Sequence, residues 1–239
     1  MITTILFDLD STLLPMDQDV FVKSYFKELA VKLIPHGYDP KTLTDAIWGG
    51  TAAMVKNDGS RLNKDAFWEF FCRIYGEAVR KDEPIFEEFY RVEFQKAASS
   101  CGFNPEAAKT VTKLKETGFR VALATNPLFP EIATKSRIQW AGLSPSDFEL
   151  YTTYENSHYC KPNPDYYQEV ISALGCRAEE CLMVGNDVGE DMVAETLGMR
   201  VYLLTNCLIN RDGADISRWP RGGFDDLLAF VRHLRGLSA

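Results

Sequence analysis

Apolar residues follow two patterns along this chain: short uninterrupted runs, and longer stretches in which they recur at helical spacing. The first run, residues 3–7, has no polar alternation, which is typical of a strand covered on both faces in a parallel sheet. From Asn104 onward the two patterns alternate regularly. Asn104 caps the first helix of this series, Pro105 lies in its first turn, and Gly118 ends it.

The alternation continues through the second half of the chain. We predict strands at 120–124, 148–152, 181–184 and 200–204, and helices at 130–140, 163–175, 187–197 and 224–234. Strands that alternate with helices of this length indicate an α/β fold with a doubly wound parallel sheet.

Residues 16–99 break this alternation, because strand signals are weak there and aromatic residues such as Phe67 and Phe71 recur at helical spacing. We interpret this segment as an inserted helical unit whose aromatics form its own core. Its Gly49-Gly50-Thr51 sequence predicts a turn that ends a helix, or else a loop that approaches phosphate.

Composition narrows the class of protein. The chain has 239 residues, of which 46% are hydrophobic, so it can bury a sizeable core. Its formal net charge is −8, which disfavours nucleic acid as a partner. A cation at the binding site would therefore have to neutralise the negative charge of a phosphorylated substrate.

The cysteine pattern points to reduced thiols and a cytoplasmic location. Six cysteines are present without any CxxC spacing, so zinc is not indicated. Asp8 and Asp10 interrupt the N-terminal apolar stretch too early for a signal peptide. No apolar run approaches the roughly 20 residues that span a bilayer, so we expect no membrane partner.

The first candidate chemistry follows the first strand. Asp8 and Asp10 are two residues apart, so an extended backbone would direct both carboxylates to the same side. They come at the carboxyl end of a strand, where α/β sheets bind their ligands. Taken alone, the run from Asp8 to Thr12 could equally be a polar loop.

Three further segments carry polar groups at strand ends or ahead of a helix. Thr125-Asn126 follows one strand, and the threonine hydroxyl can bond a phosphate oxygen. Lys161 stands ahead of a helix N-terminus, where its charge adds to the helix dipole, although it could also be a surface lysine. Asp187 and Asp191 follow a third strand, or else cap the next helix.

If these segments converge, four carboxylates crowd together and each raises the pKa of the others. Such a cluster requires a cation. Oxygen ligands favour a hard ion, and Mg²⁺ fits best because it takes one or two carboxylates, waters and a substrate phosphate.

With these four segments in this order, the chain resembles the haloacid dehalogenase superfamily, in its phosphatase branch with a helical cap, and is similar to phosphoglycolate phosphatases. The resemblance implies a Rossmann-like core, residues 1–15 and 100–239, and an α-helical cap, residues 16–99. It also implies a phosphatase that acts on a small phosphorylated metabolite through an aspartyl-phosphate intermediate.

The resemblance also implies roles for individual residues. Asp8 attacks phosphorus, while Asp10 protonates the leaving oxygen and then activates water. The metal ligands are Asp8, the main-chain carbonyl of Asp10, and Asp187. The residues expected to contact substrate are Thr12, Thr125, Asn126 and Lys161.

One departure from the family pattern concerns the third strand end. Relatives often have Gly-Asp where this chain has Gly185-Asn186-Asp187, so the acidic position is displaced by one residue. We assign the metal role to Asp187 and expect Asn186 and Asp191 to support it, with Asp191 orienting Lys161 or binding through water.

Other functions share part of this pattern. A phosphomutase or phosphotransferase would have the same motifs, and a phospho-accepting regulatory module also has an acidic pocket with one threonine and one lysine. Asp10 argues against such a module, because an acid/base group shortens the life of an aspartyl phosphate. Dehalogenation ranks low for a related reason, since it has no use for a second acid.

Overall fold

Five strands form one parallel sheet in the order β2-β1-β3-β4-β5. The structure, a computed structural model, describes residues 1–234, so the last five residues of the predicted core lie outside the described part. The strands are β1 (Thr4–Phe7), β2 (Arg120–Leu123), β3 (Cys181–Gly185), β4 (Arg200–Leu204) and β5 (Arg221–Gly222). The predicted fold class is confirmed, although the short β5 was not predicted.

Alternation of side chains along β1 explains why both faces of the sheet are covered. Ile5 and Phe7 join one apolar cluster, and Leu6 between them joins the cluster on the opposite face. Helices α5 (Pro105–Glu116) and α8 (Phe224–Leu234) pack against the first face. Helix α7 (Pro164–Leu174) and the 3-10 helix η6 (Met192–Leu197) cover the second.

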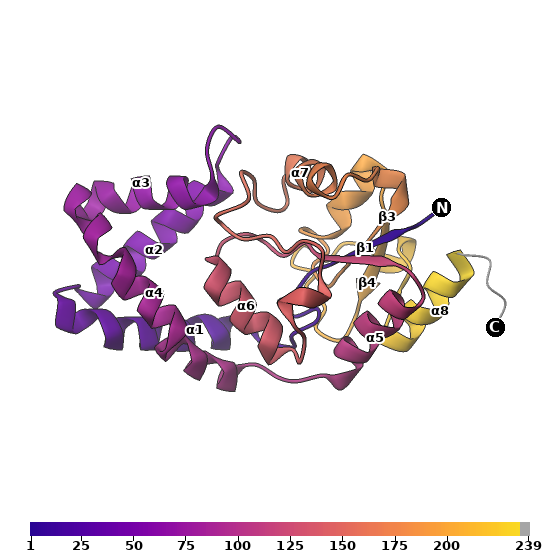
Figure 1. Ribbon diagram of the computed structural model, residues 1–239, viewed down its shortest axis with the longest axis horizontal. Helices are drawn as coiled ribbons and strands as arrows, with labels where there is room; N and C mark the ends of the chain where they lie inside the picture. Colours follow the sequence, from indigo (N-terminus) through magenta and orange to yellow (C-terminus); the bar gives the residue numbers. More distant parts are fainter. Residues whose placement is uncertain (235–239) are drawn as a thin grey trace.

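All elements of secondary structure between β1 and α5 are helices, as predicted for the insertion. The longer elements are α1 (Gln18–Leu33), α2 (Pro40–Val55), α3 (Asn63–Tyr75) and α4 (Glu83–Arg91). Figure 1 shows these four helices together at one end of the molecule, beside α6 (Glu131–Trp140) and away from the sheet. We refer to α1–α4 as the helical unit.

The structure corrects the interpretation of Gly49 and Gly50. They lie inside α2, and neither ends a helix nor forms a phosphate loop. A Cβ atom at Gly49 would lie 2.2 Å from the ring of Phe70, and one at Gly50 would lie 2.5 Å from that of Phe67. Glycine is therefore needed here for the close contact between α2 and α3.

Two predicted elements were wrong. Residues 148–152 do not form a strand, although Tyr151 makes an isolated parallel bridge with Leu123. Residues 188–191 are turns, Asp187 makes an isolated parallel bridge with Ile209, and only a 3-10 helix follows. The carbonyl of Glu190, which an α-helix would bond to the N–H of Ala194, accepts instead from the hydroxyl of Tyr167 at 2.7 Å, and the N–H of Ala194 donates to the carbonyl of Asp191, which is 3-10 spacing.

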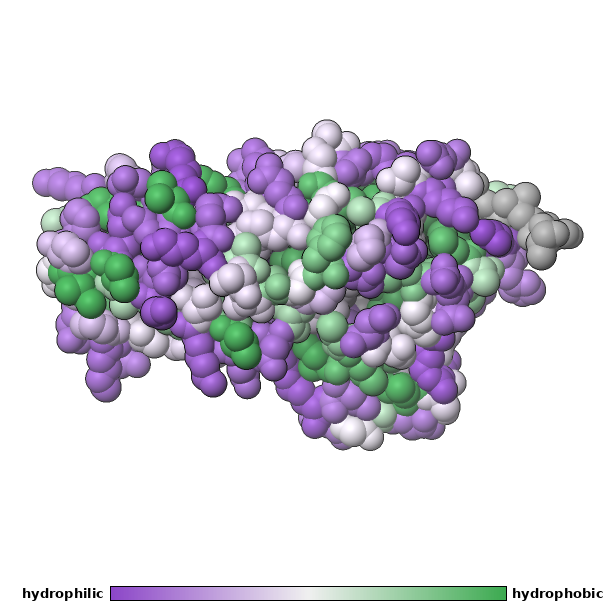
Figure 2. Space-filling view, turned by 90° about the horizontal axis from the view of Figure 1, so that it is seen from below, coloured by the Kyte–Doolittle hydropathy of each residue, from purple (hydrophilic) through white to green (hydrophobic). Residues whose placement is uncertain are grey.

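The outer surface is mainly polar. Figure 2 shows one face, where hydrophilic residues predominate and hydrophobic residues form small separate groups. Within residues 1–234, no helix has the length and apolar character that crossing a membrane requires.

Candidate active site

Residues that follow β1, β2 and β3 line one cavity at the carboxyl edge of the sheet. Because β1 lies between β2 and β3, the three strand ends are neighbours. The predicted site residues that line this cavity are Asp8, Asp10, Thr125, Asn126, Asn186, Asp187 and Asp191. Lys161 lies directly behind them, in contact with Asp8.

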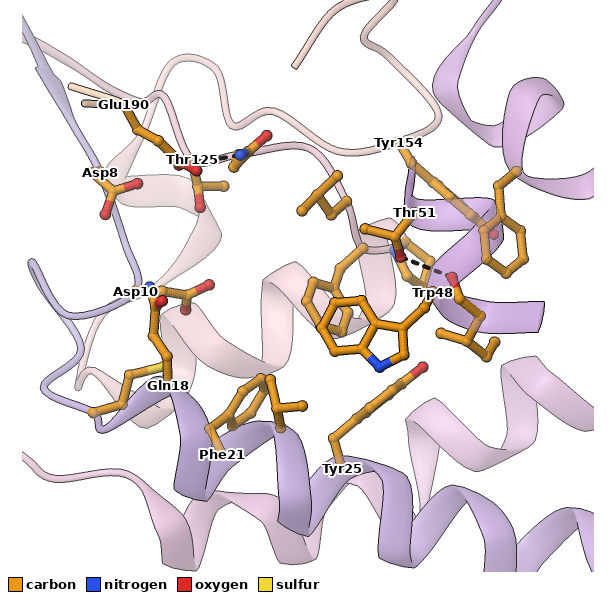
Figure 3. A pocket seen from close by; sticks show the side chains of 18 of the residues that line it. Asp8, Asp10, Gln18, Phe21, Tyr25, Trp48, Thr51, Thr125, Tyr154 and Glu190 are labelled. Atoms are coloured by element: carbon orange, nitrogen blue, oxygen red, sulfur yellow. Dashed lines mark hydrogen bonds between the residues drawn. The ribbon is translucent and has the colours of Figure 1, made fainter. Parts of the chain in front are cut away.

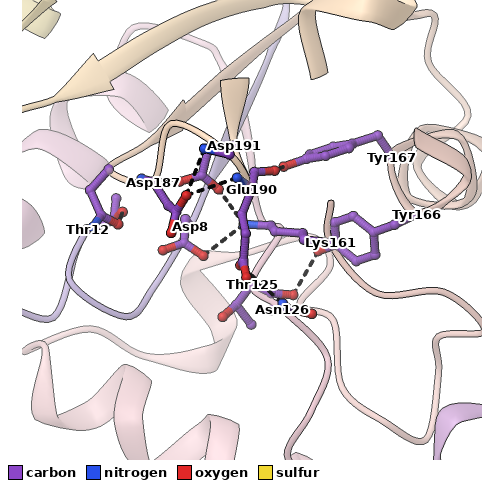
Figure 4. Close-up of polar contacts among 12 residues, drawn as sticks. Asp8, Thr12, Thr125, Asn126, Lys161, Tyr166, Tyr167, Asp187, Glu190 and Asp191 are labelled. Atoms are coloured by element: carbon purple, nitrogen blue, oxygen red, sulfur yellow. Dashed lines mark hydrogen bonds and ion pairs between the residues drawn. The ribbon is translucent and has the colours of Figure 1, made fainter. Parts of the chain in front are cut away.

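Lys161 is the charge centre of this cluster (Figure 4). Its Nζ lies 2.9 Å from Oδ1 of Asp8 and 2.6 Å from Oδ1 of Asp191, and its side chain is fully buried. Burial alone lowers the pKa of a lysine, but the carboxylates of Asp191 and Asp8 outweigh burial and raise the pKa of Lys161 well above its ordinary value. Lys161 therefore remains a cation beside Asp8.

Asp191 reaches Lys161 because a glycine leaves it room. A Cβ atom at Gly185, the last residue of β3, would lie 2.1 Å from Oδ2 of Asp191. The same oxygen accepts a hydrogen bond from the backbone N–H of Asp187 at 2.9 Å. Asp191 is thus fixed between the strand end and Lys161, and its role in orienting Lys161 or binding the metal through water stays a prediction.

The turn directly after the two predicted catalytic acids is conformationally strained. Ser11 has φ = 65°, in the left-handed region that non-glycine residues rarely adopt. Its buried hydroxyl donates to the carbonyl of Met16 at 3.1 Å, and the backbone N–H of Asp8 donates to the carbonyl of Val184 at 2.9 Å. These bonds hold the chain that carries Asp8 and Asp10 in a defined position.

Asp10 forms an ion pair that the sequence did not suggest. Its Oδ2 accepts a hydrogen bond from Nη1 of Arg137 on α6, and its buried Oδ1 has no hydrogen-bond partner within the described residues. Burial raises the pKa of Asp10, Arg137 lowers it and Asp8 raises it, and the net direction is upward. One oxygen of Asp10 is therefore anchored by Arg137, and the other is buried without a hydrogen-bond partner among the described residues.

Arg137 is itself fully buried, with an exposed fraction of 0%. Its guanidinium lies over the ring of Phe129, 4.4 Å from the ring centre, and Nη2 donates to Oγ1 of Thr134 at 3.3 Å. A signal for this residue did exist in the sequence: it shares a helical stripe with Ala133 and Ala141. A charged residue in such a stripe needs a buried partner.

Asn186 is held by the protein on both sides of its amide. Oδ1 accepts a hydrogen bond from the hydroxyl of Thr12 at 2.7 Å, and Nδ2 donates to the carbonyl of Cys207 at 2.7 Å. Thr12 thus supports Asn186 from behind the cavity lining, and its predicted contact with substrate stays a prediction.

Asp187 lies in the cavity with both oxygens in contact with other groups. Oδ1 accepts backbone N–H bonds from Gly189 and Glu190 at 2.8 and 3.0 Å, and Oδ2 lies 3.3 Å from Nη1 of Arg211. A carboxylate has about four lone-pair positions, so these contacts leave capacity for a metal.

Thr125 and Asn126 extend the cavity wall after β2. The carbonyl of Thr125 accepts hydrogen bonds from the hydroxyls of Thr152 and Tyr166, at 2.6 and 2.8 Å, which fixes the backbone at this position. Nδ2 of Asn126 donates to Glu190 at 3.1 Å, while its buried Oδ1 has no partner among residues 1–234.

Glu190 is a fifth acid in the cavity, and sequence reasoning did not select it. Burial raises its pKa to about 7, Lys161 opposes that shift, and the nearby carboxylates of Asp191 and Asp187 add to it. The only hint in the sequence was its place next to Asp191. Metal-free protein therefore carries less negative charge here than the count of acids suggests.

The oxygen donors fit magnesium, although they do not form a closed cage. Among residues 1–234, no three His, Cys, Asp or Glu side chains are grouped so as to hold a metal by themselves. Mg²⁺ does not need such a group, because it keeps several waters and takes one or two carboxylates plus substrate phosphate. Asp8 and Asp187 supply two carboxylates on one cavity wall, and the unpartnered oxygen of Asp10 indicates that this wall can receive a polar ligand.

Comparison with known proteins identifies a family for this chain. Residues 2–194 match the family model described as haloacid dehalogenase-like hydrolase. The phosphoglycolate phosphatase of Aquifex aeolicus is 25% identical over 201 residues, which cover 83% of each chain. The pyrophosphatase PpaX of Halalkalibacterium halodurans is 24% identical over 211 residues, covering 88% of this chain and 87% of that protein.

Among solved structures, the 2-haloacid dehalogenase of Pseudomonas syringae pv. Tomato DC3000 superposes with a TM-score of 0.65 at 17% identity. The superposition covers 98% of this chain and 100% of that one. At this identity the likeness supports the fold alone.

Proposed function

The chain belongs to the haloacid dehalogenase-like hydrolase family, and we propose that it is a magnesium-dependent phosphatase that hydrolyses a small phosphomonoester through an aspartyl phosphate on Asp8. The observation that carries the proposal is the position of Lys161, 2.9 Å from Asp8 and fully buried. A buried cation beside a carboxylate nucleophile offsets the charge of an incoming phosphate dianion. The phosphatase names of the relatives support the same reaction class.

The reaction would proceed in two displacements at phosphorus. In the first, a carboxylate oxygen of Asp8 forms a bond to phosphorus as the bond to the leaving oxygen breaks, and Asp10 gives its proton to that oxygen. In the second, Asp10 takes a proton from water as the water oxygen bonds to phosphorus, and the bond from phosphorus to the Asp8 oxygen breaks, which releases inorganic phosphate and the Asp8 carboxylate. Both carboxyl groups then return to their starting protonation states.

Arg137 would position the acid in both steps. It holds Oδ2 of Asp10 and would so fix the orientation of the carboxyl group that donates and later accepts the proton. Thr125 and Asn126 line the wall beside Asp8, where they would contact the phosphoryl oxygens together with Lys161.

Asp8, Asp187 and the main-chain carbonyl of Asp10 would hold Mg²⁺, which when bound supplies charge neutralisation and orientation of the phosphoryl group. We further propose that residues 16–99 act as a cap over residues 1–15 and 100–239. Helices α1 and α2 contribute residues to the same cavity as Asp8, so substrate would be enclosed between the two parts.

The test of this function is metal-dependent release of phosphate from a panel of small phosphomonoesters. Release should stop when a chelator is added in excess and return with Mg²⁺, because unscreened carboxylates repel the substrate dianion. Ca²⁺ should restore little activity, since its larger and looser shell would misplace Asp8 relative to phosphorus. Undiminished turnover in excess chelator would contradict the metal requirement.

A second prediction concerns the Arg137–Asp10 pair. Arg137→Met should lower the free energy of unfolding by about 3 kcal/mol. This loss is at the lower end of the range for breaking a buried ion pair, because Asp10 also lines the cavity. The double variant Arg137→Met/Asp10→Asn should lose less than the two single variants combined, because no unpaired charge remains. Urea unfolding monitored by circular dichroism measures all three.

A matched control for this pair lies on the same helix. Lys135 pairs with Glu131 at 2.9 Å, but the two side chains are 43% and 48% exposed, so water screens the pair. Lys135→Met should therefore change the free energy of unfolding by about 0.5 kcal/mol or less. Equal effects of Lys135→Met and Arg137→Met would show that the buried pair does not stabilise the site.

A further inference from the structure

The cavity extends well beyond the catalytic carboxylates. Its volume is about 370 Å³, and it runs from Asp8 and Asp10 into the helical unit. Figure 3 shows the two acids at one end and the rings of Tyr25 and Trp48 at the other. The aromatic residues that line it from α1, α2, α3 and the core include Phe21, Tyr25, Trp48, Phe67, Phe129 and Tyr154.

Positive charge is confined to the catalytic end of this cavity. Among the described residues that line it, Arg211 is the only lysine, arginine or histidine. Arg211 lies 3.3 Å from Asp187 and 3.2 Å from Gln18, so it belongs to the acidic end. A second anionic group on a substrate, placed among the aromatic rings, would be buried without a partner, which is strongly unfavourable.

Three hydroxyl groups of this wall, those of Tyr25, Tyr90 and Thr51, already have partners. Tyr25 and Tyr90 share a hydrogen bond of 3.0 Å through their phenol oxygens. The hydroxyl of Thr51 donates to the carbonyl of Ile47 at 2.9 Å. These groups therefore do not call for a polyhydroxylated leaving group such as a sugar, because a sugar would have to compete with bonds that exist.

The wall also offers an aromatic surface that is not yet covered. Trp48 is 50% exposed although it lines the cavity, and its ring lies 5.6 Å from that of Phe26. Tyr25 and Phe129 meet edge to face with their centres 5.6 Å apart. A flat apolar group that enters here can bury Trp48 and extend this aromatic packing.

We propose that this cavity takes the uncharged aromatic leaving group of its substrate, which is an aryl or arylalkyl phosphomonoester. The inference rests on the proposed phosphatase function and specifies its substrate class. It sets the chain apart from relatives named for phosphoglycolate and pyrophosphate, because those two compounds carry further negative charge where this cavity presents aromatic and other uncharged side chains.

The test compares three phosphomonoesters of primary alcohols, so that the phosphoryl group leaves from the same kind of oxygen. They are 2-phenylethyl phosphate, ethyl phosphate and phosphoglycolate, each measured with Mg²⁺. We expect kcat/KM for 2-phenylethyl phosphate to exceed that for ethyl phosphate by about tenfold or more, from burial of the phenyl ring. Phosphoglycolate should be no better than ethyl phosphate.

The outcomes separate this inference from the proposed function. Phosphate release with phosphoglycolate or ethyl phosphate equal to or better than 2-phenylethyl phosphate would overturn the inference and leave the phosphatase proposal intact. If no ester is hydrolysed, the phosphatase proposal fails. A binding measurement then tests whether the cavity takes an aromatic group. Calorimetry with 2-phenylethylphosphonate and ethylphosphonate should then show about tenfold tighter binding of the aromatic compound, and equal affinities would overturn the assignment.

A variant locates the preference within the cavity. Trp48→Ala removes the half-exposed indole, so the ratio of kcat/KM between 2-phenylethyl and ethyl phosphate should fall by about fivefold or more. Trp219→Ala makes the same truncation outside the cavity lining, where the indole N–H donates to Glu195, and should leave the ratio unchanged. An unchanged ratio in Trp48→Ala, or equal changes in both variants, would overturn the assignment.

Discussion

Replacing Asp8 by asparagine should lower the rate of phosphate release at least about ten-thousandfold and leave the fold intact. An amide has the same shape as the carboxylate but is not a nucleophile toward phosphorus. The fold should survive because Lys161 keeps its ion pair with Asp191 at 2.6 Å when the charge on Asp8 is lost. Removing one carboxylate from a crowded acidic cluster also relieves repulsion in the metal-free protein.

The measurement is release of inorganic phosphate by pure protein, with circular dichroism and thermal unfolding as checks on the fold. Intact mass should be recorded as well, so that conversion of the asparagine back to aspartate is detected. Asp165→Asn is the matched control, because Asp165 is an exposed residue in the first turn of α7. Turnover near the wild-type rate in Asp8→Asn would exclude Asp8 as the nucleophile.

The site residues at the carboxyl edge of the sheet could be predicted from the sequence, because their position depends on a topological rule. Asp8, Thr125 and Asp187 each follow a buried strand. When such strands are parallel neighbours, the residues that follow them lie at one edge of the sheet, as they do after β1, β2 and β3. No side-chain detail is needed for that conclusion. The same rule explains why the order of the sheet could be left open while the site was predicted.

What the sequence did not reveal depends on contacts between distant segments. Arg137 lies in a helix whose sequence does not identify a partner for it, and its partner Asp10 is 127 positions away along the chain. Local spacing carries no information on such a pair. The helix predicted from residue 187 was wrong because the pattern of apolar residues does not show that the hydroxyl of Tyr167, 23 positions earlier, bonds the carbonyl of Glu190.

For the aromatic residues of the insertion, the sequence does not show which side chains pack in a core and which line a cavity. They were interpreted as the core of a helical bundle, and several are: Phe71 and Phe89, for example, are fully buried. Helical spacing does not separate these from Phe21, Tyr25 and Trp48, which line the cavity. Packing and substrate contact require the same apolar surface, so only the three-dimensional arrangement distinguishes the two uses.

Asp10→Asn should produce a different defect from Asp8→Asn. With an alkyl phosphate, whose leaving oxygen must be protonated, kcat should fall by about a hundredfold to ten-thousandfold. With an aryl phosphate that has a good leaving group, transfer to Asp8 needs little help from an acid, so this step should remain fast. Hydrolysis of the aspartyl phosphate still requires a base, and the amide that replaces the Asp10 carboxylate is not one.

The aryl substrate should therefore phosphorylate the Asp10→Asn protein faster than water clears it. Rapid mixing should show a burst of released phenol, and mass spectrometry should detect protein that carries one phosphoryl group. The double variant Asp8→Asn/Asp10→Asn should show neither signal, which would locate the phosphoryl group on Asp8. Equal losses for alkyl and aryl substrates without any phosphoprotein would contradict the acid/base role and leave Asp10 as a partner that neutralises the buried charge of Arg137.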